Sequence, residues 1–196
     1  DDLQAQGMLH AAFVRSPYAH ARILRIAIDA ALKAPGDVAV YTGRDFASVC
    51  KPWIGTLTTF SGMRSEPQSA LAIEQVKWQG EAVAVVIADS RALAEDAIAL
   101  VEVDYTELEP VVSIDSARSG TAAPIHAAIP DNICFKRDVL TEGFEACFSE
   151  ADIVVEQQFE FGRQTGVTLE PRSILADFNP ALNALHVQHS HQAPHM

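Results

Sequence analysis

The apolar residues of this chain fall into short runs separated by turn-forming residues, a pattern that is typical of several short strands. In the first half of the chain the runs predict strands at residues 9–14, 23–28, 38–41 and 83–88. The run VAVVIA at residues 83–88 is apolar at every position. We therefore expect it to form a strand that is buried on both faces.

Two helix starts are predicted from capping residues. Thr42 is followed three positions later by Asp45, which is the spacing of a capping box. Ser90 precedes an apolar stripe with the spacing of one buried helix face, formed by Leu93, Ala94, Ala97, Ile98 and Val101. Because a strand is predicted before this helix and another at residues 101–105, the order strand, helix, strand indicates a layer of helix on sheet.

Other turn and loop signals divide the rest of the chain. Asp29 is predicted to cap a short helical turn at residues 30–33, and residues 50–70 have the composition of a long loop. Residues 113–131, rich in Ala, Gly, Ser and Pro, are the best candidate linker. Beyond them, Thr141 is predicted to cap a helix that pairs Phe144 with Phe148, and strands are predicted at residues 153–161, 172–178 and 185–191.

Composition narrows the class of protein. The 196 residues are 48% hydrophobic and 20% charged, which is typical of a globular protein, and the net charge of −12 disfavours binding to nucleic acid or to an anionic membrane. No run of eighteen apolar residues and no secretion signal is visible, so we expect a cytoplasmic protein. Cys50, Cys134 and Cys147 lack C-x-x-C spacing, which predicts reduced thiols in the core and no iron–sulfur cluster on this chain.

Two polar motifs near the end carry the candidate chemistry, GRQTGVTLEP at residues 162–171 and HSHQAPH at residues 189–195. Pro171 disfavours helix at Glu170, so that carboxylate is expected on extended or turned chain. Gln192 follows an alternating strand and precedes a proline, a position that suits an amide orienting a polar ligand. The alternatives without a functional role are a salt bridge between Glu170 and Arg172, and an ordinary surface amide at Gln192.

Two clusters of basic and histidine side chains have competing interpretations. His189, His191 and His195 share strand parity and could face one way with His186 nearby, but no cysteine or carboxylate lies close in sequence. We therefore predict no native metal ligands here, and leave open adventitious binding of zinc or nickel. A second cluster near the N-terminus is either a solvated strand end or an interface with a neighbouring subunit; it is formed by Arg15, His20 and Arg22.

Several long segments, in order, resemble one family. They are GMLHAAFVRSPYAHARI (7–23), VAVYTGRDF (38–46), VKWQGEAVAVVIADSRALAEDA (76–97) and VEVDYTELEPVV (101–112). Together with the two motifs above, they resemble the large, molybdopterin-binding subunit of the molybdenum hydroxylases, the family of xanthine dehydrogenase, aldehyde oxidase and carbon monoxide dehydrogenase. The chain departs from the family at Ala82, where proline is usual, and at His191, where threonine is commoner.

The resemblance implies an α+β protein with two domains. An α/β hammerhead domain would occupy residues 1–115, followed by a linker at residues 116–131. Residues 132–196 would then form the N-terminal part of the molybdopterin-binding domain, a partial α/β molybdenum-cofactor domain. In this family Gln192 matches the glutamine that hydrogen-bonds an oxo ligand of the molybdenum, and Glu170 lies in the segment that supports the cofactor site.

The resemblance also implies a function. The expected activity is a molybdenum-dependent hydroxylase or dehydrogenase of the type that oxidises xanthine, aldehydes or carbon monoxide, with water as the source of oxygen. The complete protein would bind molybdopterin or its cytosine dinucleotide form, with iron–sulfur clusters and FAD on partner domains or subunits, and would form an oligomer. The family's catalytic base and Gly-rich loop are expected beyond residue 196, so the fragment alone should be inactive and hold no cofactor. The alternative is a stand-alone hammerhead interaction or scaffold domain without catalysis.

Overall fold

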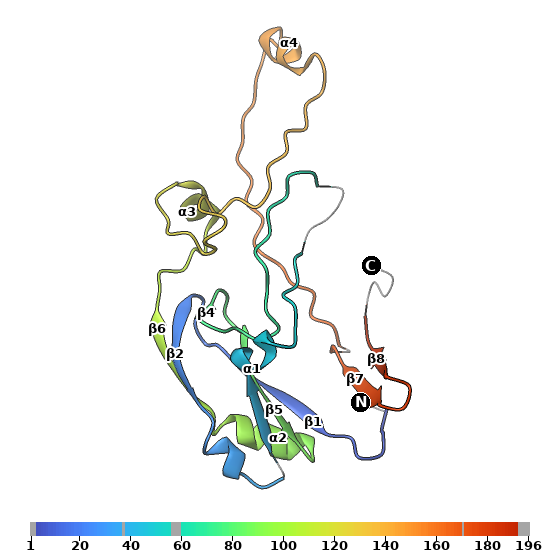
Figure 1. Cartoon of the computed structure of the whole chain (residues 1–196). Coiled ribbons are helices and arrows are strands. Elements are labelled where there is room, and N and C mark those ends of the chain that lie inside the picture. The colour runs from blue at the N-terminus through green and yellow to red at the C-terminus, as the bar shows by residue number, and fades with distance from the viewer. Residues whose placement is uncertain (1–2, 37, 56–59, 170, 192–196) are drawn as a thin grey trace. The chain divides into compact units, whose positions relative to one another are not determined.

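The computed structural model describes residues 3–36, 38–55, 60–169 and 171–191 (Figure 1). Its contacts divide the chain into two compact units, one of residues Gly7–Asp138 and one of Val139–Met196 with Asp1–Gln6. Each unit is described by itself. No helix among the described residues is both long and apolar enough to cross a membrane.

One three-stranded antiparallel sheet forms the centre of the first unit. The strand β5 (Ala82–Ala88) lies between β1 (His10–Arg15) and β3 (Ala39–Thr42), and Val85 faces residues on both neighbours. Five of the seven residues of β5 are buried, which confirms the strand predicted from its continuous apolar run.

Both predicted helix starts next to this sheet are confirmed. The Asp45 carboxylate accepts the Thr42 backbone N–H at 2.7 Å at the start of α1 (Gly43–Ala47), and this hydrogen bond lowers the pKa of Asp45. The Ser90 hydroxyl accepts the Leu93 N–H at 3.3 Å at the start of α2 (Arg91–Ile98). The buried alanines of α2 pack against β1 and β5 in the clusters formed by Ala94 with Ala12 and Ala88, and by Ala97 with Ala84 and Val86.

A second antiparallel sheet completes the first unit. Its central strand is β2 (Ala21–Ala27), paired on one side with the short β4 (Gln75–Val76) and on the other with β6 (Glu102–Glu107). Buried residues from β2 and β4 pack with Val83, so the two sheets share a core. Because β5 and β6 belong to different sheets, the predicted order strand, helix, strand crosses from one sheet to the other.

The short helical turn after β2 forms without its predicted cap. The 3₁₀ helix η1 (Ala31–Lys33) has Ala30 at its N-cap position and no side-chain cap, so the role predicted for Asp29 was wrong. The reason is that backbone carbonyls already accept the first donors, from Leu32 to Ile28 at 3.0 Å and from Lys33 to Ala30 at 3.2 Å.

The segment predicted as a linker holds ordered structure within the first unit. The Ser113 hydroxyl accepts the Ser116 N–H at 3.1 Å and caps α3 (Ile114–Arg118). Further along, Asp131 forms an ion pair with Arg64 at 2.6 Å. The domain boundaries predicted at residues 115 and 131 stay a prediction.

The core position predicted for the three cysteines was wrong. Cys50, Cys134 and Cys147 are free and exposed. The reason is that Cys50 and Cys134 lie in loops, and Cys147 lies on a helix, Phe144–Ser149, that buries none of its residues.

The described residues of the second unit form one helix and one hairpin. The rings of Phe144 and Phe148 in α4 (Phe144–Ser149) lie 4.8 Å apart, as predicted, but Gly143 in the left-handed conformation stands at the N-cap and Thr141 does not. Strands β7 (Ile174–Asn179) and β8 (Ala184–His189) pair in antiparallel register, which confirms the last two predicted strands with shifted ends.

The strand predicted at residues 153–161 was wrong, because the structure has no strand there. An extended segment becomes a strand only when a neighbour pairs with its backbone groups. In the described part of the chain β7 and β8 pair with each other alone. The apolar side chains of this segment are consequently exposed, 84% for Val155 and 91% for Phe161.

We expect the second unit to be less stable than the first when the 196-residue chain is studied alone. A single hairpin with exposed apolar residues has little buried surface to oppose local opening. Amide hydrogen exchange should show weaker protection in β7 and β8 than in β5. Equal protection in a monomeric sample would contradict this expectation.

Candidate functional site

The two polar motifs near the end of the chain meet at one end of the β7–β8 hairpin. The Ser190 N–H donates to the Ser173 carbonyl at 3.1 Å, and the Ser173 N–H donates to the Ser190 hydroxyl oxygen at the same distance. The Ser190 hydroxyl also lies 3.4 Å from the Pro171 carbonyl oxygen, which it donates to. The chain that follows Glu170 therefore contacts the chain that precedes Gln192, although both of these predicted site residues lie outside the described residues.

Local sequence explains why these segments converge. The Asn179 side-chain oxygen accepts the N–H groups of Ala181 and Leu182 at 3.0 and 3.2 Å, which fixes the turn between the strands. The resulting register places Ile174 opposite His189. Because a one-residue slip would turn every side chain to the other face, the turn also determines which residues meet at the open end.

The described groups at this end hold the two segments together. The Ser190 hydroxyl donates to the Pro171 carbonyl, and the N–H groups of Ser173 and Ser190 donate across the hairpin. The described part of the junction offers no thiolate for direct metal coordination. A glutamine amide next to this junction would be the group that donates to a ligand oxygen, which fits a cofactor such as molybdopterin that carries its own metal.

The histidines on β8 lie close to this junction. The rings of His189 and His191 meet edge to face with centroids 5.2 Å apart, which confirms that these two share a face. Among the residues that the structure describes, no group of three or more His, Cys, Asp or Glu could hold a metal ion. His195 lies outside those residues, and adventitious zinc or nickel binding stays a prediction.

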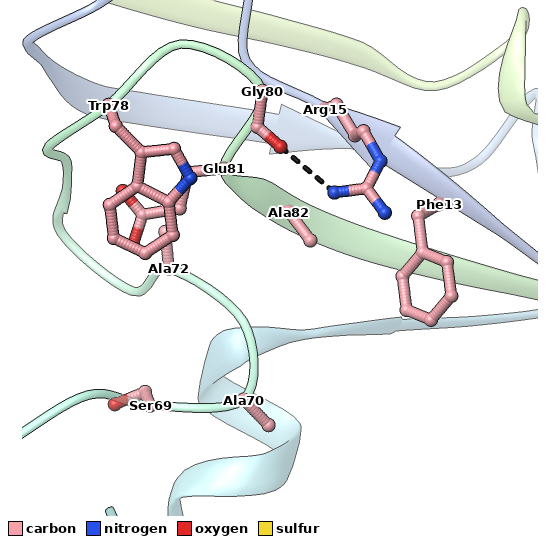
Figure 2. A pocket seen from close by; sticks show the side chains of 9 residues that line it. All are labelled: Phe13, Arg15, Ser69, Ala70, Ala72, Trp78, Gly80, Glu81 and Ala82. Carbon is pink, nitrogen blue, oxygen red and sulfur yellow. Dashed lines mark hydrogen bonds between the residues drawn. The ribbon is translucent and has the colours of Figure 1, made fainter. Parts of the chain in front are cut away.

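A pocket of about 280 Å³ opens on the first unit, beside the start of β5 (Figure 2). Arg15 lies over the Phe13 ring at 5.5 Å and donates from Nη1 to the Gly80 carbonyl at 2.9 Å. Trp78 and Glu81 also line the pocket. It could hold an amphipathic group between a guanidinium and an aromatic ring.

The carboxyl group in this pocket is electrostatically unusual and was not singled out from the sequence. Burial raises the pKa of Glu81, and the Lys77 N–H, which donates to its Oε2 at 2.6 Å, opposes that rise. The only sequence signal for it is the turn at Gly80 and Glu81 before a buried strand. That signal indicates a strand start and says nothing of a pocket.

The structure separates the predicted basic cluster of Arg15, His20 and Arg22. Arg15 lines the pocket and Arg22 is exposed on β2, whereas His20 is only 6% exposed and its Nδ1 lies 3.0 Å from the Glu109 carbonyl oxygen. A solvated strand end was therefore wrong for His20. A subunit interface at this place stays a prediction.

Two family models match this chain. The first, described as the a/b hammerhead domain of aldehyde oxidase and xanthine dehydrogenase, matches residues 1–109. The second, a molybdopterin cofactor-binding domain, matches residues 125–196. The second match contains the hairpin junction and both predicted site residues.

Similar proteins agree along the whole chain. The nicotine 6-hydroxylase large subunit of Paenarthrobacter nicotinovorans is 35% identical over 100% of this chain and 24% of its own length. The carbon monoxide dehydrogenase large chain of Hydrogenophaga pseudoflava is 33% identical over 100% of this chain and 25% of its own length. This chain thus spans about a quarter of the length of these curated relatives.

Solved structures show the same relationship. Quinoline 2-oxidoreductase from Pseudomonas putida 86 matches with a TM-score of 0.86 and 35% identity, over 97% of this chain and 24% of that one. Carbon monoxide dehydrogenase from Oligotropha carboxidovorans matches with a TM-score of 0.84 and 33% identity, over 99% of this chain and 25% of that one.

Proposed function

Because this chain belongs to the aldehyde oxidase and xanthine dehydrogenase family through its hammerhead domain, we propose that it works as part of the large subunit of a molybdenum-dependent hydroxylase or dehydrogenase. In this proposal residues 1–115 form the hammerhead domain and residues 132–196 contribute to the molybdopterin-binding domain. Residues 116–131 are the linker between these two domains. The relatives are molybdenum oxidoreductases, and different substrates are given in their names. The proposal therefore does not specify the substrate of this protein.

The observation that carries the proposal is the junction at the end of the hairpin. It brings together the segment after Glu170 and the segment before Gln192, within the part matched by the molybdopterin-binding model. The cofactor supplies the oxidation chemistry when it is bound. This chain would help to hold it: the Gln192 amide would donate a hydrogen bond to a cofactor oxygen, and Glu170 would support the adjoining segment. Ser190 joins the two segments through its contacts with Pro171 and Ser173.

Partner subunits follow from the same relationship. Relatives are named as the large chain or the gamma subunit of a complex. We infer that this protein likewise assembles with partner subunits. We propose that these partner subunits or domains carry iron–sulfur clusters and FAD, as the family resemblance implies, and that the complex is cytoplasmic.

The test compares two samples. One is the 196-residue chain alone, and the other is the complete large subunit that contains these 196 residues. Metal analysis and visible spectroscopy are expected to find molybdenum in near-stoichiometric amount in the complete subunit, co-purified with its partners, and none in the 196-residue chain. A complete protein that folds, lacks molybdenum and oxidises no purine, aldehyde, N-heterocycle or carbon monoxide would contradict the proposal. That outcome would favour the scaffold alternative.

A further inference from the structure

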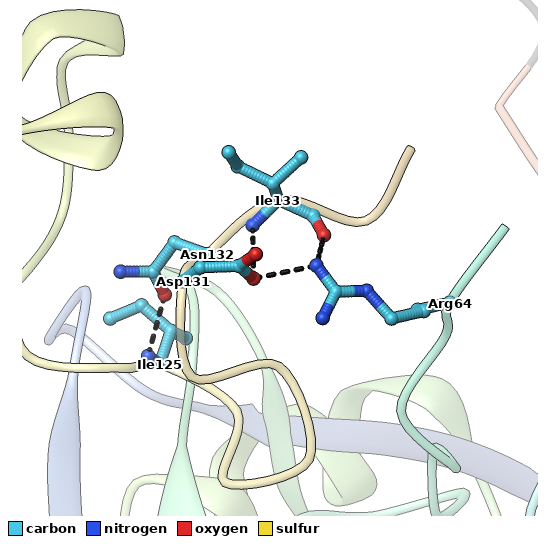
Figure 3. Close-up of polar contacts among 5 residues, drawn as sticks. All are labelled: Arg64, Ile125, Asp131, Asn132 and Ile133. Carbon is cyan, nitrogen blue, oxygen red and sulfur yellow. Dashed lines mark hydrogen bonds and ion pairs between the residues drawn. The ribbon is translucent and has the colours of Figure 1, made fainter. Parts of the chain in front are cut away.

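Residues 123–135 form a compact loop that lies within the first unit, Gly7–Asp138. The Asn132 side chain holds it closed, because Oδ1 accepts the Ile125 N–H at 3.0 Å (Figure 3). Its Nδ2 also donates to the Ala123 carbonyl at 3.2 Å. Asn132 has φ of 55°, a left-handed conformation that asparagine tolerates better than most residues. We call residues 123–135 the strap.

The strap is fastened to the loop at residues 60–68 mainly by Arg64. The Arg64 guanidinium forms an ion pair with Asp131 at 2.6 Å and also donates to the Ile133 carbonyl (Figure 3). The Arg64 backbone N–H donates to the Cys134 carbonyl at 2.8 Å. The rings of Phe60 and Phe135 meet edge to face with centroids 4.8 Å apart. Since both side chains of the ion pair are about half exposed, at 42% and 53%, that pair stabilises the strap only weakly.

Buried polar atoms lie at the same contact. His20 Nε2, Glu66 Oε2 and His126 Nδ1 are shielded from solvent and have no hydrogen-bond partner among the described residues. His126 belongs to the strap, Glu66 to the opposing loop and His20 to the turn before β2. Buried polar atoms without partners are costly, and a charge placed among them is costlier.

The charged groups around His126 determine which of its protonation states the closed strap prefers. Burial lowers the pKa of His126 from its ordinary value of 6.5, Lys77 and His20 act in the same direction, and Glu66 opposes them. The closed strap therefore favours neutral His126.

We propose that the strap is a contact that mild acid releases: it is closed while His126 is neutral and opens when His126 is protonated beside the unpartnered atoms of His20 and Glu66. A histidine that is harder to protonate in the closed form makes the open form bind more protons. The free energy that favours the closed strap is therefore at its full value when the pH is above 6.5, the ordinary pKa of histidine. This free energy decreases as the pH falls below that value.

The carboxyl groups of Asp131 and Glu81 differ from His126 in their response to mild acid. The pKa of Asp131 is lowered from 3.8 by its hydrogen bond with Arg64, so the Asp131–Arg64 pair stays charged throughout mild acid. The pKa of Glu81 is raised by burial, so its protonation in acid favours the folded form, which is the opposite sign. Neither group can produce an opening as pH falls towards 5.5, which is about one unit below the ordinary pKa of histidine.

Amide hydrogen exchange of the 196-residue chain at about pH 7.5 and about pH 5.5 tests the proposal, with each rate divided by the intrinsic rate at that pH. The Arg64 amide, which bonds across the contact, and the Ile125 amide, which bonds within the strap, are the probes. Their protection is expected to fall several-fold at the lower pH, and at most about tenfold per pH unit if one proton is taken up. Amides of β5 should keep their protection.

Three variants make the test specific. His126→Gln keeps a polar side chain without a titrating ring, so its protection should not differ between the two pH values. Asp131→Asn should lower protection at both values and keep the pH dependence. His186→Gln, at an exposed histidine of the other unit, should behave as the unchanged chain. Unchanged protection in acid, or full pH dependence in His126→Gln, would overturn the proposal.

Discussion

Replacing Gln192 by alanine in the complete large subunit is expected to lower turnover by about 10²–10³-fold, the usual effect of losing one preorganised donor at a developing charge. The reason is that the glutamine amide is proposed to donate to a cofactor oxygen on which charge grows during the reaction. The residue follows strand β8 and the Ser190 junction, so truncation should leave the hairpin intact. Steady-state kinetics with metal analysis of the same sample would measure both effects.

Two further substitutions separate this role from a general disturbance. Gln192→Glu should lower turnover at least as much, because a carboxylate that only accepts would face a cofactor oxygen. His189→Ala is the matched control on β8, and its effect should be mild, since His189 is an exposed strand residue that contacts the His191 ring. A Gln192→Ala enzyme with normal molybdenum content and unchanged turnover would reduce this residue to an ordinary surface amide.

Replacing Gly43 by alanine is expected to destabilise the first unit by about 1–3 kcal/mol, the usual cost of overpacking. Gly43 begins α1 directly after β3, and a Cβ there would lie 2.5 Å from the Ala72 carbonyl oxygen and 2.8 Å from that of Leu71. Both are backbone atoms and cannot rotate away. Urea unfolding followed by tryptophan fluorescence would measure the loss, because Trp53 and Trp78 both lie in this unit.

The control for this change is Gly166→Ala in the second unit. A Cβ at Gly166 meets no atom within 4 Å, so its substitution should leave the fluorescence transition unchanged. If Gly43→Ala unfolds at the same urea concentration as the unchanged chain, the backbone at residues 71–72 can move away from the added Cβ. That outcome would contradict the prediction.

Local signals in the sequence determined most elements of the first unit. The cap at Ser90, the box of Thr42 and Asp45 and the apolar run of β5 each depend on residues within a few positions of one another. Such patterns act on the chain locally, so they can be interpreted without knowing the fold. The motifs around Glu170 and Gln192 were likewise visible in the sequence, together with the family that they resemble.

Only the tertiary structure decided what depends on distant residues. The sequence predicted a strand at residues 153–161, but a strand exists only where another segment pairs with it. It also placed His20 in a solvated cluster, whereas packing buries it against the carbonyl of Glu109, 89 residues away. The fastening of Arg64 to Asp131 and the contact of Ser190 with Pro171 join segments 67 and 19 residues apart. Pairing and burial are set by the whole chain, because each requires surfaces that no short stretch of sequence contains.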